Sequence, residues 1–256
     1  MGRHGQRVAV TAAAVPLLLA AALAGCSASS PAPPAPATTH PSAAPVITVA
    51  GDHPVPGNGS QDTNAQTPGA RCDRTTFATD QAVGGRIAAG FTGTGLPVSA
   101  ELLTHFLGGT GTAVGFRAGS VISKDARASA AFRTMDSQVQ SAILGQLKTG
   151  RAEVRLSAAQ LPTVSFESSG GDLYWGFRGT QGLTVTGRVH RANGRYAGTL
   201  TYVIRDSYGF PAGDTLAGFG APMRYLQTVC GAPQHAGGAH WFPDTITVTV
   251  PFSHPA

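Results

Sequence analysis

The chain has 256 residues, of which 42% are hydrophobic and only 12% are charged, and its formal net charge at pH 7 is +5. A chain of this length and apolar content can build a domain with a real hydrophobic core. The small positive excess is spread along the chain and does not form the clustered basic surface that nucleic-acid binding needs. We therefore expect no nucleic-acid partner.

The first residues have the pattern of an export signal. Arg3 and Arg7 form a short basic start, an apolar run follows, and the run ends in Leu23-Ala24-Gly25-Cys26. A basic start, an apolar stretch and small residues before a cleavage point are typical of a secretory signal. The alternatives are an ordinary signal with a chance cysteine, and an uncleaved membrane anchor, for which the apolar run is only marginally long enough.

Leu23-Ala24-Gly25-Cys26 resembles the lipobox of a bacterial lipoprotein precursor. The resemblance implies removal of residues 1–25, a diacylglyceryl thioether on Cys26, and acylation of the new amino terminus by a fatty acid such as palmitate. Several long acyl chains hold a protein firmly on a membrane. We therefore expect an extracytoplasmic, lipid-anchored protein of the cell envelope, with membrane lipid as its first partner and cell-wall components as further candidates.

The source organism is suggested by composition alone. Alanine, glycine and proline are abundant, and only Lys124 and Lys148 are lysines, because arginine supplies the other basic side chains. This usage is typical of a GC-rich, actinomycete-like organism.

Residues 26–71 are predicted to be the lipidated cysteine followed by a disordered tether. Nine of the 18 prolines lie here among Ser, Ala, Thr and Gly, and Val46-Ile47-Thr48-Val49 is almost the only aliphatic stretch. Such a composition buries too little apolar surface to offset the entropy lost on ordering. Its Ser, Thr and Pro content also resembles O-glycosylated stalks. The globular domain is then expected over residues 72–256.

Two cysteines remain if Cys26 carries lipid. Cys72 and Cys230 would meet an oxidising compartment after export, and we expect them to form a disulfide. The bond would join residues 158 positions apart, for which the chain-entropy model gives about 5 kcal/mol. The alternative is two buried free thiols.

Helical signals occupy three parts of the chain. Pro97-Val98-Ser99 opens a short helix with Ser99 as its N-cap, and glycines 108 and 109 end it. The strongest signal predicts a helix over residues 124–148 with Ser123 as N-cap. A third short helix ends near Cys230. One apolar stripe at helical spacing marks the strongest helix: Phe132, Met135, Val139, Ile143 and Leu147.

Alternating residues between 151 and 208 predict a β-meander, including a strand over 173–177. The dipeptide Asn193-Gly194 favours a type I′ hairpin turn. With that turn, one face of the hairpin is apolar and the other polar, and a slip of one residue would destroy the agreement. The expected inward pairs are Val189 with Gly198, Gly187 with Leu200, Val185 with Tyr202, and Leu183 with Ile204.

A last strand is predicted over residues 245–252. Strands that lie between helices indicate an α+β class. We expect a single domain in which an antiparallel meander and hairpin sheet packs against two or three helices.

Catalytic signatures are scarce. G-x-S-x-G and S-x-x-K motifs do not occur. The glycine-rich run 109–115 lacks the G-x-G-x-x-G spacing and the P-loop lysine, and it is better interpreted as a turn after a helix. His235, His240 and Asp244 are weak candidates for metal ligands, although loop histidines are usually only solvated. We expect neither a metal nor a cofactor.

One constellation bears on catalysis. Asp206-x-Tyr208-x-Phe210 resembles the D-x-Y-D-F segment of colicin M-type domains, which cleave the lipid-linked peptidoglycan precursor. The resemblance implies that Asp206 and Tyr208 are weak catalytic candidates, but Gly209 replaces the second aspartate and no His-Arg pair follows. In the simpler interpretation Asp206 begins a turn, and Tyr208 and Phe210 pack in the core.

Taken together, these features favour a cell-surface lipoprotein with an envelope binding or structural role, and they lean away from an enzyme. The first alternative is a cell-wall or lipid-linked precursor hydrolase with Asp206 at its centre. The second is a lipoprotein that binds a small apolar ligand within the sheet.

Overall fold

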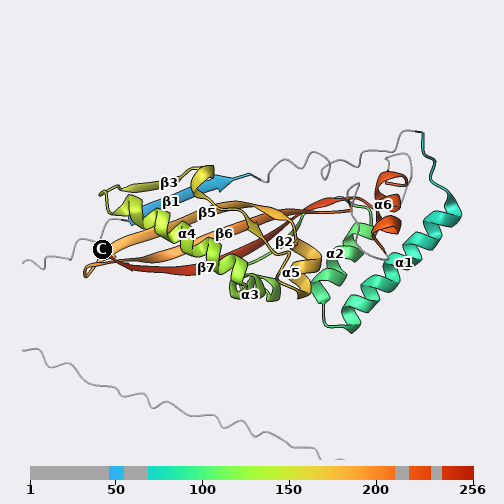
Figure 1. The fold of residues 1–256 in the computed structure, drawn as a ribbon, viewed down its shortest axis with the longest axis horizontal. Helices are drawn as coiled ribbons and strands as arrows, with labels where there is room; N and C mark the ends of the chain where they lie inside the picture. The colour runs from blue at the N-terminus through green and yellow to red at the C-terminus, as the bar shows by residue number, and fades with distance from the viewer. Residues whose placement is uncertain (1–45, 55–68, 211–218, 232–237) are drawn as a thin grey trace, which may run out of the picture. The chain divides into compact units, whose positions relative to one another are not determined.

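A mixed β-sheet organises the fold (Figure 1). The computed structural model describes residues 46–54, 69–210, 219–231 and 238–256, which belong to a compact unit spanning Ala43–Ala256. Its sheet has the strand order β2-β7-β6-β5-β1-β3, and β4 pairs with β5 off this path. The strands are β1 (Val46–His53), β2 (Val114–Phe116), β3 (Glu153–Leu156), β4 (Val164–Ser165), β5 (Thr180–Ala192), β6 (Arg195–Tyr208) and β7 (Phe242–Pro255).

The α+β class is confirmed, but the expectation of a purely antiparallel sheet is wrong. The pairs β1–β3 and β2–β7 are parallel, whereas β1–β5, β5–β6 and β6–β7 are antiparallel. One strand of each parallel pair, β3 or β2, lies at an edge of the sheet. The two strands of each parallel pair are separated by a long stretch of chain that includes helices, because parallel strands cannot be joined by a tight turn.

The prediction of a disordered tether through residue 71 is wrong for residues 46–53. These residues form β1, which lies between β5 and β3 and pairs with β5 over its whole length. Ile47 and Val49 are buried while Thr48 is exposed. Four apolar and β-branched residues suffice for a strand here because two neighbouring strands supply its hydrogen bonds and its buried face.

The hairpin between β5 and β6 has the predicted register. Leu183 lies opposite Ile204, and the other three inward pairs are also as expected. Asn193 and Gly194 have φ angles of 51° and 70°, the left-handed values that a type I′ turn requires. The prediction of a final strand is also confirmed, because β7 buries Ile246 and every second residue through Phe252.

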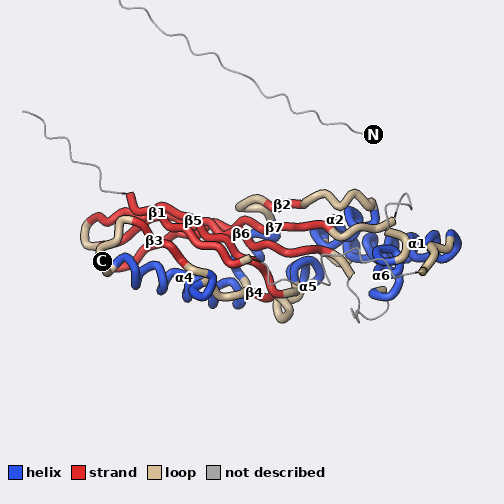
Figure 2. The backbone as a smooth tube through the Cα atoms, turned by 90° about the horizontal axis from the view of Figure 1, so that it is seen from above, coloured by secondary structure: helices blue, strands red, loops and turns tan. Residues whose placement is uncertain are grey.

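Six helices lie among the described residues, and Figure 2 shows that α4 runs along one face of the sheet. They are α1 (Arg74–Gly93), α2 (Pro97–Leu107), α3 (Val121–Ala128), α4 (Ala130–Leu147), α5 (Gly171–Phe177) and α6 (Gly220–Thr228), with a 3₁₀ turn at Ala158–Gln160.

The single helix predicted over 124–148 is in fact two helices. Ser129 has an extended backbone with φ −67° and ψ 150°, which ends α3, and its side chain caps α4 by accepting from the Phe132 N–H. Ser123 is not the N-cap of α3; Ser120 is, and the Ser123 hydroxyl donates to the Thr247 carbonyl at 2.7 Å. The apolar stripe of α4 is buried throughout, as predicted.

The strand expected over 173–177 is wrong, because these residues belong to helix α5. Leu173 and Phe177, four residues apart, are both buried, which fits a helical face as well as a strand of alternating residues. Asp172 lies in the first turn of α5. It is buried and accepts hydrogen bonds from the main-chain N–H groups of Val98 and Ser99 and from the Ser99 hydroxyl.

Asp172 thus caps α2 from a distant part of the chain, where the sequence had indicated Ser99 as the cap. Helix α1 was not predicted as a helix, because four glycines interrupt it. At least one of them lies at a close contact between helices. A Cβ atom on Gly84 would lie 2.8 Å from a methyl group of Leu107 in α2.

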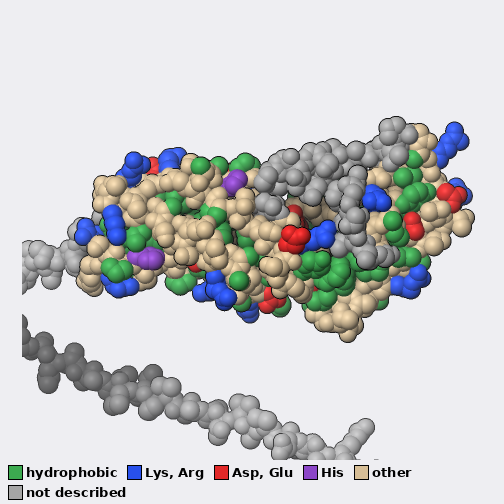
Figure 3. All heavy atoms as spheres, viewed as in Figure 1, with side chains coloured by type: hydrophobic (Ala, Val, Ile, Leu, Met, Phe, Trp, Pro, Cys, Tyr) green, Lys and Arg blue, Asp and Glu red, His purple; other side chains and the backbone are tan. Residues whose placement is uncertain are grey.

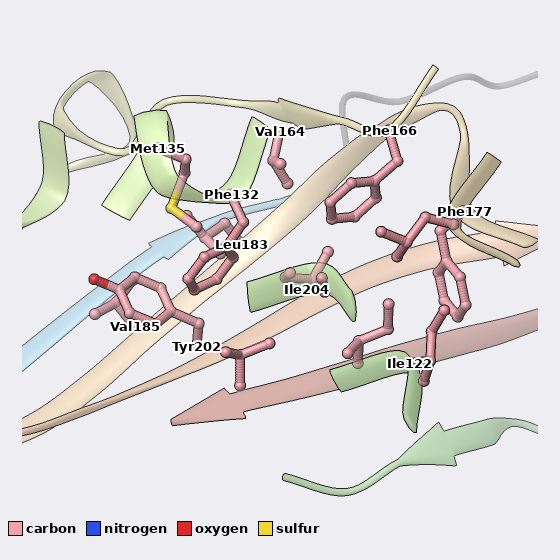
Figure 4. Close-up of a cluster of buried hydrophobic side chains, with 14 of the residues drawn as sticks. Ile122, Phe132, Met135, Val164, Phe166, Phe177, Leu183, Val185, Tyr202 and Ile204 are labelled. Carbon is pink, nitrogen blue, oxygen red and sulfur yellow. The ribbon is translucent and has the colours of Figure 1, made fainter. Parts of the chain in front are cut away.

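The main core lies between the helices and the inner face of the sheet, the face on which the strands bury alternate residues (Figure 4). Phe132 and Met135 of α4 point toward Leu183, Val185 and Tyr202 of the hairpin. The Phe132 and Tyr202 rings meet edge to face at 5.3 Å. On the opposite, outer face of β6 no side chain is fully buried. Thr199, Thr201 and Val203 lie on this face and alternate with the core residues of the strand.

Hydrogen bonds fix α4 on the inner face. The Tyr202 hydroxyl donates to Asp136 Oδ1 at 2.6 Å, and Gln140 Nε2 donates to Asp136 Oδ2 at 2.9 Å. Gln140 Oε1 in turn lies 2.8 Å from His254 Nε2 of β7. Burial, followed by the adjacent Asp136 carboxylate, raises the pKa of the Tyr202 hydroxyl, so that the hydroxyl stays a donor.

Candidate functional site

The two aspartates singled out separately in the sequence lie opposite each other in the sheet. Asp206 of β6 pairs in register with Asp244 of β7. On the inner face, this pair lies between two others: Ile204 with Ile246, and Tyr208 with Phe242. Directly opposed residues on one face of an antiparallel pair have Cβ atoms about 4.5–5.5 Å apart. The structure therefore brings together a pair of carboxyl groups, which we call the carboxyl pair.

The carboxyl pair is asymmetric in its exposure. Asp206 is half-buried, whereas Asp244 is fully buried, and Val114 of the neighbouring strand β2 is its partner in the sheet. Neither carboxyl oxygen of Asp244 has a hydrogen-bond partner from another residue within the described part of the chain. Buried polar groups in native proteins are nearly always partnered, and an exception requires an explanation.

Electrostatics follow from this placement. Burial raises the pKa of the Asp244 carboxyl well above its ordinary value, and the Asp206 carboxylate raises it further. Both causes disfavour the charged form. A strongly shifted carboxyl with a specific charged neighbour is the kind of group found at functional sites, although structural networks also produce such shifts.

Aromatic rings surround one side of the carboxyl pair. Tyr208 stacks on Phe242 with ring centroids 5.4 Å apart, and Phe106 of α2 meets both Tyr208 at 6.2 Å and Phe210 at 5.0 Å. Tyr208 and Phe210 are buried, as the simpler interpretation of this segment predicts. That interpretation is wrong for Asp206, which lies within β6 and does not begin a turn.

The metal candidates do not come together among the described residues. His235 lies outside them. His240 is half-buried, and its main-chain N–H donates to the Phe106 carbonyl, while Asp244 is paired with Asp206. No group of three or more His, Cys, Asp or Glu side chains in the described ranges could hold a metal ion.

The glycine-rich run after α2 is a packing feature. Gly109 and Gly111 have φ angles of 66° and 64°, and a Cβ atom on Gly109 would lie 2.2 Å from the Gly238 carbonyl oxygen. His105 Nε2 lies 2.8 Å from the Thr112 carbonyl oxygen. Glycine is needed because two loops approach each other through their backbones, which agrees with the interpretation of this run as a turn.

The predicted disulfide is present and holds the helices at this end of the sheet. Cys72, just before α1, is bonded to Cys230, just after α6, with a Cα–Cα distance of 4.9 Å. The Asp73 N–H also donates to the Tyr225 hydroxyl of α6 at 2.9 Å. The end of the sheet that carries the carboxyl pair is therefore closed by a covalent bond between α1 and α6.

Sequence reasoning named both aspartates but missed their pairing. The available signal was the phase of alternation. Asp206 continues the inward series of Tyr202 and Ile204, and Asp244 precedes the inward residues Ile246 and Val248. Extending the hairpin register to the last strand would have placed both carboxyl groups in core-facing positions.

The surface gives little indication of a partner. On the face in Figure 3, Lys and Arg side chains are scattered and do not form one stripe. None of the helices in the described ranges combines the length and the hydropathy needed to span a bilayer. Comparison of the chain with protein-family models, with curated proteins and with solved structures finds no match. The site is therefore interpreted from its own chemistry.

Proposed function

We propose that this chain is an extracytoplasmic lipoprotein, anchored in the cell membrane through acylated Cys26, whose globular domain has a binding or structural role in the cell envelope. The observation that carries the proposal is the bond between Cys72 and Cys230. Structural disulfides persist in oxidising compartments and are rare in the cytosol. The disulfide is therefore the feature of the domain that agrees with an export signal ending in Cys26.

The anchor is tested by producing the full chain in an actinobacterial host fed with labelled palmitate. We expect label and a membrane location for the wild type, and loss of both for Cys26→Ser. The control Cys72→Ser breaks the disulfide but leaves Cys26 in place, so it should keep the label. A wild-type chain that remains in the cytosol with residues 1–25 attached and no fatty acid would refute the proposal.

The envelope role is tested separately with the disulfide-bonded domain and purified cell walls. We expect the domain to sediment with the insoluble wall fraction in a saturable manner, and bovine serum albumin to remain in solution. If the domain stays in the supernatant at every wall concentration, cell-wall binding is refuted, whatever the result for lipidation.

The carboxyl pair favours a second candidate, a hydrolase of the lipid-linked peptidoglycan precursor. Asp206 lies beside the Asp244 carboxyl, whose raised pKa suits a proton donor. Asp244 would supply the second carboxyl group, which the colicin M-type resemblance lacks because Gly209 stands at that position. Turnover of purified precursor that disappears in Asp206→Asn and persists in Asp125→Asn, an exposed acid of α3, would establish this activity. No turnover by the wild type would exclude it.

A further inference from the structure

We propose that the domain docks on the anionic phospholipid surface of its own membrane through one end of the sheet, the end at which β5 turns into β6. We call it the hairpin end. The proposal rests on the proposed function, because the anchor at Cys26 brings this end to the membrane. Its basis is that the first described strand begins where exposed basic side chains gather. These are Lys148, Arg151, Arg188, Arg191 and Arg195.

Strand pairing and one helix bring these side chains to the same end. β5 ends and β6 begins at the turn, and β1 begins beside them, because Val46 pairs with His190. The end of α4 arrives from the inner face, where the Leu147 carbonyl accepts a hydrogen bond from the Tyr196 hydroxyl at 3.1 Å. Lys148 follows directly, so the segment after α4 adds its basic side chains to those of the hairpin.

The hairpin end keeps its positive charge. Lys and Arg side chains also lie elsewhere on the surface (Figure 3), but none of the five at this end forms an ion pair with another described residue. The acid at the start of the adjoining β3, Glu153, is already paired with Arg155 at 2.8 Å. The Ala256 N–H donates to the Gly194 carbonyl at 2.8 Å, so a free carboxylate at Ala256 would offset one charge and leave four.

The side chains of the hairpin end match a phospholipid headgroup. Arg195 donates to the Ser253 hydroxyl, and the Arg191 guanidinium lies 5.8 Å from the centre of the Tyr196 ring. These contacts orient both arginines without neutralising them, and a guanidinium presents paired N–H groups to a phosphate. Val46 at the same end is 60% exposed. An apolar side chain among basic ones fits an interface in which phosphate groups cover acyl chains.

The route of the chain favours a membrane over any other anion. Between Cys26 and Val46 there are 19 residues, and even a fully extended segment of that length spans about 70 Å at most. An anchor on Cys26 therefore keeps the hairpin end close to the lipid surface and raises the effective concentration of headgroups around it. A soluble anion or a polymer of the wall has no such fixed proximity.

Docking through the hairpin end also sets the orientation of the domain. Asp206 lies 11 positions beyond Arg195 in β6, which is about 35 Å at about 3.3 Å per residue. The disulfide lies at the same end as Asp206. The carboxyl pair would therefore face away from the membrane, toward the cell wall.

The binding test uses the mature chain, residues 26–256, with Cys26→Ser, so that no lipid contributes. We expect this chain to sediment with phosphatidylcholine vesicles that contain one third phosphatidylglycerol, and to stay in solution with pure phosphatidylcholine vesicles. High salt should release it, because salt screens exposed charges. Each Lys or Arg near an anionic surface strengthens binding about fivefold, so Lys148→Gln/Arg151→Gln/Arg188→Gln should weaken binding by about tenfold or more.

A matched control removes the same number of positive charges from another part of the domain. Arg74, Arg86 and Lys124 are exposed residues of α1 and α3. The triple variant Arg74→Gln/Arg86→Gln/Lys124→Gln should therefore bind anionic vesicles nearly as well as its parent chain. Circular dichroism establishes that both triple variants are folded. If the first is not, Arg188→Gln compared with Arg86→Gln decides.

The orientation test uses vesicles of the same composition whose acyl chains carry bromine, which quenches tryptophan on contact. Trp175 in α5 and Trp241 just before β7 lie away from the hairpin end, so emission of the Cys26→Ser chain should not be quenched. The further substitution Val46→Trp should add emission that the brominated chains quench.

Three results would overturn the proposal. The first is a chain that binds anionic vesicles no better than neutral ones at millimolar lipid. The second is equal weakening by the two triple variants, which would assign the attraction to net charge alone. The third is quenching of the native tryptophans without quenching of the Val46→Trp emission. Each result is obtained without lipid on the protein, so it is separate from the labelling test of Cys26 and from wall binding.

Discussion

The inner face of β6 carries polar side chains at two places, and these places differ in whether their polar groups have hydrogen-bond partners. At Tyr202, every polar group is partnered, because the hydroxyl, Asp136, Gln140 and His254 form a connected series of hydrogen bonds that fixes α4. At Asp206, four residues further along the same face, the opposing Asp244 has two carboxyl oxygens without a partner from another described residue.

This difference suggests a structural role for the Tyr202 network and a functional role for the carboxyl pair. A fully satisfied buried network stabilises one arrangement of side chains, whereas an unsatisfied buried group lowers the stability of the fold. The fold holds the unsatisfied Asp244 carboxyl by other means. The disulfide and the aromatic contacts of Phe106 close that end of the sheet, so the carboxyl pair does not need to contribute to stability.

The largest expected effect is that of the disulfide. The double variant Cys72→Ser/Cys230→Ser should lose about 5 kcal/mol of unfolding free energy, because the bond closes a long loop. Urea denaturation measures the loss. Hydrogen exchange should show faster opening of α1 and α6 than of α4, since only the first two are joined by the bond. Equal loss of protection in all three helices would show that the two ends of the sheet unfold as one unit.

The second effect concerns the satisfied network. Tyr202→Phe should lower the unfolding free energy by about 1–3 kcal/mol, because Asp136 Oδ1 loses its donor in a partly buried place. Tyr174→Phe is the matched control; Tyr174 is half-buried, and we expect no change. Urea denaturation of both variants at pH 7 checks the difference. If both cost the same, the network contributes nothing specific.

The third effect has the opposite sign. In a buffer with EDTA at pH 8, Asp244→Asn should raise the unfolding free energy by about 1 kcal/mol, because it removes one of two opposed like charges. Asp52→Asn is the contrasting control. Asp52 accepts hydrogen bonds from Thr184 and Arg205 on the outer face, so its substitution should give a small loss. A clear destabilisation by Asp244→Asn would mean that this carboxyl has a partner essential to the fold.

Much of the fold could be predicted because it depends on local alternation. The hairpin register follows from one turn, and the buried stripe of α4 follows from helical spacing; both depend on residues close in sequence. Three of the failures have a common cause. β1, α1 and the cap of α2 depend on distant partners, namely β5, Leu107 and Asp172, and no local pattern reveals such partners.

The candidate site shows the same limit more sharply. Asp206 stands in a recognisable segment and Asp244 near two histidines, so each was grouped with its neighbours in the sequence. Their relation arises only when β7 pairs with β6. The disulfide was the exception among distant contacts, because two cysteines left over in an exported chain have few other partners.

The smallest effect, the pH dependence of the Asp244→Asn gain, tests the cause of the repulsion directly. The pKa of Asp244 is raised in the folded state, so above the ordinary aspartate pKa of about 4 the folded protein holds a proton that the unfolded chain has lost. Deprotonating the folded group at higher pH costs extra energy, and the unfolding free energy contributed by Asp244 should fall as pH rises through this window. The advantage of Asp244→Asn over wild type, measured by urea denaturation in EDTA, should therefore be smallest at pH 4 and largest at pH 8. An advantage that does not change with pH would mean that the Asp244 carboxyl is not the titrating group, and the contrast between the two polar places on β6 would lose its electrostatic basis.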